Sequence, residues 1–542
     1  MTTTNGTKGV GRTIVRAALV ASIVAGSLAG IPLIRSYAVP ATVVRTQALD
    51  GATLGGPAAR AIRLGSSGSL RAGRVAGRTD ALTVCAPIWF DGMALTWARS
   101  SGREPNVLVR TAYREGAFGD VVELDPEGGA DPGRGEYRRD AGGSTFLWTG
   151  GSRCARIGLE LRPRSSVAGL RVVFVNSSGT AGGPRTGPPQ VGPSALGDAP
   201  WPPTAGARTA EPRIITREQW GANPRLMSCT PEVADFLEVG FVHHTAGSNS
   251  YSRAQADDVV RGVYAYHTKG RGWCDIGYNF LVDRYGDVFE GRSGGITQDV
   301  IGAAQMGFNT GAFSVSLMGT FDASRPPAAT IRALQRLLAW RLDVAHLNPR
   351  AFGEMTSGGG RTTRYKKGAV VRLHVISGHR DTGLTACPGA ALYRLLPGIR
   401  RAVGRLGLPK IYDPRLSTAT FVPGAPQRVR IGAKGSARLS WSVTVLGPDE
   451  AKVAELTADD GDRLALWWRP TLDTPGTYRV VIAASNGGGQ PARPAELLFV
   501  VEPPSPSPSP SPSPSPSPSP SPTPSPSPSE TPTPTPSASP ST

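Results

Sequence analysis

Histidine and cysteine are scarce in this chain of 542 residues, and both are unevenly placed. All six histidines lie between positions 243 and 379, so a site built from imidazole groups is confined to the middle of the chain. The five cysteines are an odd number, and by region they divide into Cys85 with Cys154, Cys229 with Cys274, and Cys387 alone. An odd thiol in an exported protein is expected to be reactive or to bind a metal.

Core-forming side chains are missing from the last stretch, 503–542, which is nearly pure Pro-Ser and Pro-Thr. We expect a disordered polyproline-II tail, about 120 Å long if fully stretched at about 3.1 Å per residue. Such a tail is a spacer or a glycosylated stalk rather than a catalytic element. The stretch 179–210 is rich in Gly, Pro and Ala and has no hydrophobic periodicity, so it is predicted to be a linker.

Long apolar runs are also rare, and the main one covers 17–34. Three basic residues precede it and the small-residue segment 36–38 follows it, which is the order of a secretory signal peptide. An uncleaved membrane anchor is the alternative, because the run is near the lower length limit for crossing a bilayer. With 1–41 as signal or anchor, both interpretations export the rest of the chain, and we expect a secreted or cell-wall-associated protein.

Acidic residues are outnumbered by basic ones, 41 to 59, which gives a net charge of +18. A polyanionic partner suits such a charge, and nucleic acid is the usual first hypothesis. Export favours the anionic polymers of a cell wall instead. We therefore expect no nucleic-acid partner, and membrane contact only if the N-terminal segment is uncleaved.

The hydrophobic pattern predicts three folded domains, since the chain is too long for a single core. Alternation of period two with frequent turns predicts an N-terminal β-sandwich over 42–178 and an immunoglobulin-like β-sandwich over 409–502. The segment 211–408 mixes helical and strand periods. It is predicted to be a central α/β domain with a mixed β-sheet flanked by helices, in a multidomain chain.

Two histidines and the odd cysteine stand out in this central domain. His243 ends a predicted strand, and His379 lies in the sequence SGHRD, eight residues before Cys387. Two imidazoles and one thiolate make three protein ligands for Zn²⁺ and leave the fourth tetrahedral position to water, which is the catalytic pattern. The alternative is that these histidines are ordinary core residues.

Seven motifs now become informative because they occur together and in a fixed order. They are RIITREQWGA at 213–222, FVHHTA at 241–246, GWCDIGYNF at 272–280, VFEGR at 288–292, GFN at 307–309, GHRD at 378–381 and ACP at 386–388. Through them the chain resembles the type 2 N-acetylmuramoyl-L-alanine amidases and peptidoglycan recognition proteins. The resemblance covers about two hundred residues and does not extend to the Pro-Ser tail.

The resemblance implies a zinc amidase that cuts the bond between N-acetylmuramic acid and L-alanine in peptidoglycan, for wall remodelling or lysis. It places one zinc ion on His243, His379 and Cys387, and it assigns catalytic roles to Tyr278 and Thr385. A Thr at the latter position could instead cap the turn. Family members that only bind peptidoglycan typically lose the cysteine ligand, which this chain keeps. A non-catalytic peptidoglycan-binding or wall-anchoring protein is the alternative.

Other residues of the central domain have weaker assignments. His267, Arg292 and Asn309 are candidate substrate contacts, with core or fold-stabilising roles as alternatives. His244 is expected to face away from the zinc, because neighbouring residues on a strand point to opposite faces. We expect disulfides between Cys85 and Cys154 and between Cys229 and Cys274. The basic, glycine-rich insertion 352–368 is expected to be a flexible loop, and the stem-peptide specificity is open.

Overall fold

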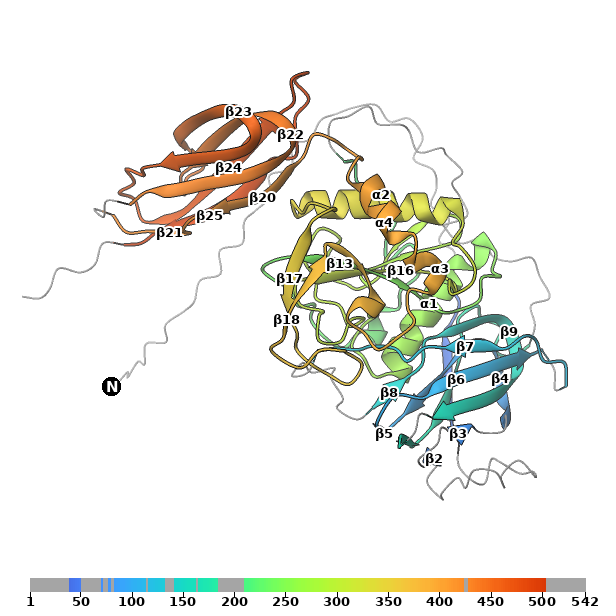
Figure 1. The fold of residues 1–542 in the computed structure, drawn as a ribbon. Coiled ribbons are helices and arrows are strands. Elements are labelled where there is room, and N and C mark those ends of the chain that lie inside the picture. The colour runs from blue at the N-terminus through green and yellow to red at the C-terminus, as the bar shows by residue number, and fades with distance from the viewer. Residues whose placement is uncertain are drawn as a thin grey trace, which may run out of the picture. The chain divides into compact units, whose positions relative to one another are not determined.

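A computed structural model describes residues 39–49, 70–71, 77–78, 82–113, 116–131, 141–161, 164–183, 209–423 and 427–503. Most of the expected signal segment, most of the expected linker and almost all of the tail lie outside these residues. The chain divides into two compact units, Met1–Leu408 and Pro409–Thr542 (Figure 1). Within the described ranges, no helix has the length and apolar character needed to cross a membrane.

The N-terminal part of the first unit is built from strands. An eight-stranded antiparallel sheet has the order β1-β11-β4-β9-β6-β7, with β3 paired to β9 and β8 paired to β4, and a three-stranded sheet has the order β2-β10-β5. Their bounds are β1 (Val43–Ala48), β2 (Leu70–Arg71), β3 (Gly77–Arg78), β4 (Leu82–Trp97), β5 (Arg99–Ser101), β6 (Asn106–Ala112), β7 (Val122–Leu124), β8 (Gly142–Gly143), β9 (Leu147–Leu161), β10 (Ser166–Ala168) and β11 (Arg171–Asn176). The strand-rich character of this region is as predicted, whereas a two-sheet sandwich layout stays a prediction.

A six-stranded mixed sheet forms the centre of the α/β part, as the sequence predicted. Its order is β12-β15-β14-β16-β13-β19, and only the β14–β15 pair is antiparallel. The bounds are β12 (Ile214–Ile215), β13 (Val239–His244), β14 (Phe280–Val282), β15 (Val288–Glu290), β16 (Ala312–Leu317) and β19 (Ile376–Gly378). The antiparallel strands β14 and β15 form a hairpin that turns at residues 283–287.

Helices cover both faces of this sheet. Side chains of α2 (Ala328–Val344) and α4 (Leu396–Val403) share a hydrophobic cluster with Phe280 and Val282 of β14, whereas α1 (Ala256–Ala265) shares another with Leu281. Successive residues of a strand point to opposite faces, so α1 lies on the face opposite α2 and α4. The remaining helical elements are η3 (Pro224–Leu226), η4 (Arg253–Gln255), the π-turn η5 (Tyr266–Gly270), η6 (His379–Asp381) and α3 (Ala390–Tyr393).

The insertion 352–368 is a loop only in part, over 357–368. Its first residues form β17 (Phe352–Thr356), which pairs antiparallel with β18 (Val370–His374). Buried and exposed positions alternate along both strands, and Met355 packs with Val371 and Leu373 in a small core. The expectation was wrong for 352–356, because the Gly, Arg and Lys content of the insertion suggested a loop, whereas the period-two alternation of these residues is typical of a strand.

One hydrophobic cluster joins the N-terminal sheet to α1. It contains Phe146, Trp148 and Val173 from the sheet region together with the apolar residues of α1, and every residue of α1 is buried. The ring of Phe146 fills the space between two glycines: a Cβ placed on Gly92 or on Gly262 would lie 2.1 or 2.9 Å from it. The two parts of the first unit are therefore held together by a shared core.

The second unit is a six-stranded sheet with its own core. Its strands are β20 (Ile411–Leu416), β21 (Thr420–Phe421), β22 (Val429–Leu446), β23 (Lys452–Trp468), β24 (Gly476–Ser485) and β25 (Ala495–Val501), in the order β20-β22-β24-β25-β21 with β23 on β22. Buried residues alternate along β24, where Tyr478, Val480 and Ile482 face the core. The immunoglobulin-like arrangement predicted for this region stays a prediction.

Because the core is shared, we predict that Phe146→Ala destabilises the α/β part as well as the N-terminal sheet. Removing a buried Phe typically costs about 3–5 kcal/mol, through lost burial and the cavity that remains. Chemical denaturation followed by signals from both parts should show one common transition at lower denaturant. Phe236→Ala is the matched control, since Phe236 is 51% exposed. An unchanged transition of the α/β part in Phe146→Ala would contradict the shared core.

Candidate active site

Two adjacent parallel strands bring the first two candidate ligands together. In the register of β13 and β19, Val242 is paired with Gly378. The next residues along the two strands are His243 and His379, so both histidines lie at the same edge of the sheet. Cys387 returns to this edge after a short turn, in which the backbone N–H of Arg380 donates to the carbonyl of Cys387 at 2.9 Å.

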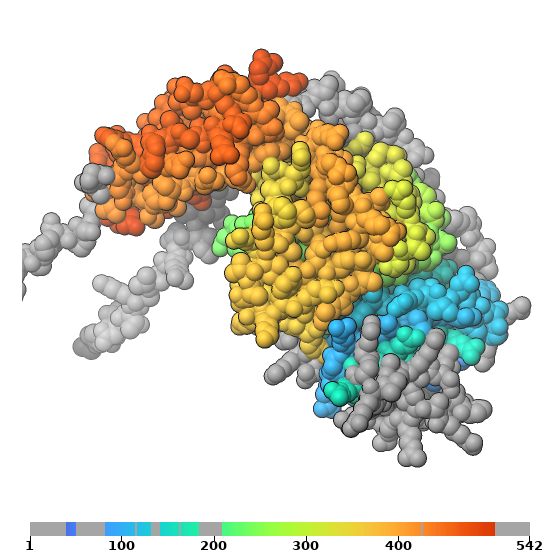
Figure 2. Space-filling view, in the orientation of Figure 1, coloured from blue at the N-terminus to red at the C-terminus, as the bar shows by residue number. Residues whose placement is uncertain are grey.

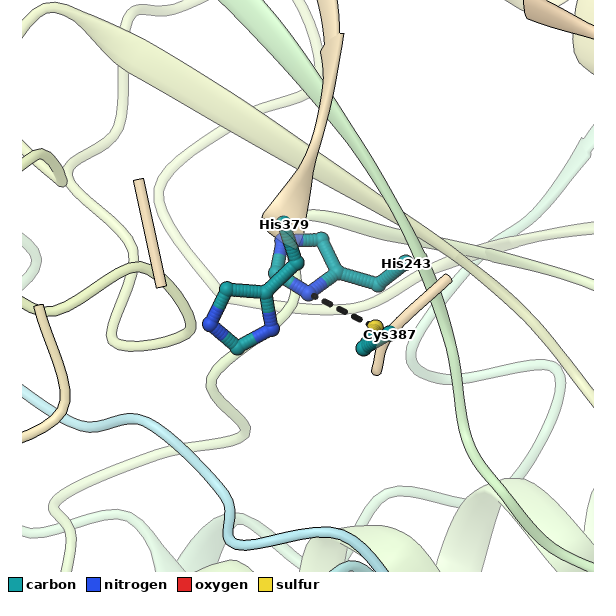
Figure 3. A group of neighbouring side chains, drawn as sticks. All are labelled: His243, His379 and Cys387. Carbon is teal, nitrogen blue, oxygen red and sulfur yellow. Dashed lines mark hydrogen bonds between the residues drawn. The ribbon is translucent and has the colours of Figure 1, made fainter. Parts of the chain in front are cut away.

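The three side chains converge on one point (Figure 3). One ligand atom from each of His243, His379 and Cys387 can be chosen so that all lie within 4.8 Å of one another, and the Sγ atom is 3.8 Å from Nδ1 of His243. All three residues are at most 5% exposed. Tetrahedral zinc with these donors would hold the ligand atoms roughly 3.3–3.6 Å apart, so a small contraction completes the site.

The electrostatics of the cluster also suit a metal. Burial lowers the pKa of His243 well below its usual value, with His379 adding to the effect, and burial lowers the pKa of His379 to about 4. Both imidazoles are therefore neutral near pH 7, which is the form that binds metals. Burial raises the pKa of the Cys387 thiol. Within the described part of the chain, Nε2 of His243 is buried and has no hydrogen-bond partner, whereas Nδ1 is the nitrogen that faces Sγ of Cys387.

Backbone and side-chain contacts hold the three ligands in place. The N–H of His244 donates to Sγ of Cys387 at 3.3 Å, and Nε2 of Gln305 donates to the carbonyl of His379 at 3.2 Å. The side chain of His244 is outside the cluster, with Nδ1 accepting from the N–H of Phe321 at 3.3 Å. Supporting contacts of this kind fix the orientation of metal ligands.

Thr385 and Tyr278 each contact a residue of the cluster. Oγ1 of Thr385 accepts from the N–H of Cys387 at 3.0 Å, so this hydroxyl shapes the turn that carries the thiol. The ring of Tyr278 is 5.5 Å from that of His243, between centroids, and only 3% of the residue is exposed. Burial raises the pKa of Tyr278 well above its usual value, and Glu127 adds to the rise, so the phenol stays protonated.

His267 lies beside Tyr278, in the π-turn that follows α1. Its Nδ1 accepts from the N–H of Gly277 at 3.1 Å, so in the neutral ring the proton is on Nε2, which lies 2.9 Å from Oε1 of Glu127. The OH of Tyr278 donates to the same oxygen at 3.0 Å. Glu127 is a residue that the sequence analysis missed, because it belongs to the N-terminal part and carries no motif.

The other two candidate contacts have different surroundings. Oδ1 of Asn309 accepts from the N–H groups of Ala304 and Gln305 at 3.0 and 2.8 Å, and its Nδ2 faces the same N-terminal segment as Tyr278 does. Arg292 donates to the carbonyl of Ile276 at 3.3 Å and lies 3.5 Å from Sγ of Cys274. Arg292 therefore contacts the turn that contains a disulfide.

Four cysteines are joined in pairs. Disulfides connect Cys85 with Cys154 and Cys229 with Cys274, and Cys387 is the free, buried cysteine. The first bond links β4 to β9, and the second links the segment after Trp220 to the loop before Tyr278. The structure thus brings together the residue pairs named from the sequence and leaves the remaining thiol at the candidate metal position.

Comparisons with known proteins match the α/β part of the chain. The family model for N-acetylmuramoyl-L-alanine amidase matches residues 237–390. Peptidoglycan recognition protein 1 of Bos taurus is 32% identical over 184 residues, which are 34% of this chain and 82% of that protein. Peptidoglycan-recognition protein SC2 of Drosophila melanogaster is 28% identical over 180 residues, 33% of this chain and 82% of that protein. The crystal structure of human PGRP-IBETAC with glycosamyl muramyl pentapeptide matches at 27% identity, covering 34% of this chain and 93% of that one, with a TM-score of 0.27.

Proposed function

The chain belongs to the family of type 2 N-acetylmuramoyl-L-alanine amidases and peptidoglycan recognition proteins, and from this premise we propose that it is a zinc-dependent amidase. It hydrolyses the amide bond between N-acetylmuramic acid and the L-alanine of the stem peptide. The observation that carries this proposal is the complete, buried cluster of His243, His379 and Cys387. Peptidoglycan is the proposed partner because the relatives are named for its recognition.

The donor set determines what the site can do. Two neutral imidazoles and a thiolate are zinc ligands, and three of them leave one position of a tetrahedral ion free. A zinc ion in such a site activates water at neutral pH and polarises a carbonyl group, which is what amide hydrolysis requires. Cys387 gives up its proton when it binds the metal, so binding is favoured as the pH rises.

Tyr278 is the proposed donor to the oxygen on which negative charge develops. Its hydroxyl stays protonated because of its raised pKa, and its ring lies beside His243. A single donor of this kind is commonly responsible for a factor of about 10²–10³ in rate. Thr385 is a weaker candidate for the same task, since its oxygen accepts from Cys387 while its proton can still be donated.

The remaining assignments follow from position. His267 and Asn309 are proposed to line the substrate groove, and Arg292 is proposed to support the disulfide-bonded turn beside it. We also propose an exported, wall-associated protein with domains at 42–178, 211–408 and 409–502, the first and last being β-sandwiches. The two disulfides and the net charge of +18 support export to an anionic cell wall.

Zinc content tests the ligand assignment. We predict one zinc ion per chain in the purified protein, and a loss of almost all of it in His379→Ala or Cys387→Ala, because two ligands do not hold the ion. His374→Ala is the matched control: it removes a histidine of the same domain that is outside the cluster, and zinc should stay. Elemental analysis after dialysis measures this. Equal zinc in the cluster variants and the control would refute the assignment.

Product analysis of digested sacculi tests the reaction. The wild-type protein should release stem peptides with a free L-alanine amino terminus, which mass spectrometry identifies. Tyr278→Phe should keep its zinc and its affinity for sacculi but lose about 10²–10³ in rate, because only the transition-state donor is removed. If zinc-loaded protein binds sacculi and releases no such peptide, the non-catalytic recognition function replaces the amidase.

A further inference from the structure

A segment of the N-terminal part lies inside the proposed substrate groove. It consists of residues 125–131, directly after β7, and we refer to it as the inserted segment. Glu127, Ala130 and Asp131 are at most 9% exposed, and their neighbours in space belong to the α/β part. Figure 2 shows the blue N-terminal strands in direct contact with the yellow-to-orange residues of that part. The groove beside the metal cluster is thus occupied by the chain itself.

Glu127 binds the groups nearest to the metal cluster. Its carboxylate accepts from the OH of Tyr278 at 3.0 Å and lies 2.9 Å from Nε2 of His267 and 3.1 Å from Nη1 of Arg271. Burial acts to raise the pKa of Glu127, but His267 and Arg271 outweigh it and the pKa is lowered, so the group is ionised. The hydroxyl that should serve the substrate oxygen is therefore engaged by an anion of the same chain.

Asp131 and Gly129 bind the far end of the groove. The Asp131 carboxylate accepts from the N–H groups of Gly307 and Asn309 at 2.6 and 3.2 Å, and from Nδ2 of Asn309 at 2.8 Å. The carbonyl of Gly129 accepts from Nδ2 of Asn309 at 3.0 Å. Between these residues Ala130 packs with Trp273 and Ala303. The segment thus offers carboxylates and a main-chain carbonyl to donors of the α/β part, and these are groups that a bound peptide also carries.

The fit of the segment is also steric. A Cβ placed on Gly128 would lie 2.7 Å from the backbone oxygen of Ala304, so any side chain there would push the segment out. On another side the packing is open: a cavity of about 380 Å³ borders Gly129 and Ala130. The segment is held at its start, where the N–H of Glu127 donates to the carbonyl of Gly143 at 2.9 Å. Residues 128–131 belong to none of the described strands, so opening of the groove concerns these residues and the side chain of Glu127.

We propose that the inserted segment is a built-in substitute for the stem peptide, which keeps the site closed until the segment is displaced. Both are extended peptides that carry carboxylates, so the same donors serve either one. The proposal rests on the proposed function, because it assumes that the groove beside the zinc cluster receives the stem peptide. Since the two ligands compete, the segment lowers the apparent affinity for substrate by the fraction of chains in which the groove is open.

The double variant Glu127→Ala/Asp131→Ala tests this by removing both anchoring carboxylates. Hydrogen exchange at the amides of Gly307 and Asn309 should become at least about tenfold faster, since each lost charge-assisted hydrogen bond changes the open fraction by about that factor. With a soluble disaccharide tripeptide from peptidoglycan, KM should fall at least about tenfold while zinc content is unchanged. Glu123→Gln is the control, an exposed carboxylate on β7 just before the inserted segment, and it should change neither quantity.

Gly128→Ala is the second variant and keeps both carboxylates. Its methyl group meets the backbone of Ala304 and should expel the segment, with the same two effects. Gly119→Ala is its control, because a Cβ there has only one ordinary contact, at 3.7 Å. If the double variant does not fold, the results for Gly128→Ala alone test the displacement of the inserted segment.

The outcomes separate this proposal from the amidase assignment. Faster amide hydrogen exchange and tighter binding of the disaccharide tripeptide, without release of peptide, would support the closure by the inserted segment and overturn the amidase activity. Unchanged exchange in both variants would overturn the closure and leave the amidase standing. A lower kcat in the double variant alone, with amide exchange unchanged in Gly128→Ala, would likewise overturn the closure and make one of the two carboxylates a group that the reaction needs.

Discussion

The pairing of β13 with β19 is the constraint on which the site depends. The parallel register that sets Val242 opposite Gly378 makes His243 and His379 neighbours, although they are far apart in the sequence. A shift of one residue would send one imidazole to the other face of the sheet. The helices α2 and α4 support this register from one face, because Val242 and Ile376 are buried in the same core as these helices. The metal cluster is thus a product of strand pairing rather than of local loop structure.

The central sheet and the cluster of two histidines and a cysteine could be predicted from the sequence because each of them carries a local signal. Mixed helical and strand periods marked the α/β domain and the strand that ends at His243, and His243, His379 and Cys387 lie in motifs whose order is specific to one family. The prediction of a loop over all of 352–368 also rested on a local signal, the Gly, Arg and Lys content of these residues. There the composition outweighed an alternation that continues into β18, and β18 supplies the partner strand.

Contacts between the N-terminal sheet and the α/β part could not have been predicted in this way. Phe146 fits against Gly262 of α1, and Glu127 reaches Tyr278, but each contact joins residues more than a hundred positions apart. The sequence around Glu127 contains two glycines and a proline and looks like an ordinary turn. Nothing in its pattern shows that its carboxylates satisfy donors of another domain, since that depends on how the two surfaces pack.

This packing also gives several buried donors of the groove their acceptors. Buried donors such as those of His267 and Asn309 lose stability when they are left without partners, and the inserted segment supplies those partners in the resting chain. In the proposed closure, a stem peptide that enters the groove replaces the acceptors of the inserted segment with its own. Opening of the groove therefore requires the stem peptide to compete with the segment for the same donors. Fold stability and the state of the site are in this way linked through the same contacts.

The proposed function depends on the identity of the metal site, and X-ray absorption at the zinc edge tests that identity most directly. The zinc-loaded protein should show one sulfur ligand at about 2.3 Å, two imidazole nitrogens at about 2.0–2.1 Å and one further light atom that exchanges with added ligands. A spectrum with no sulfur ligand, or with four protein ligands and no exchangeable position, would contradict it.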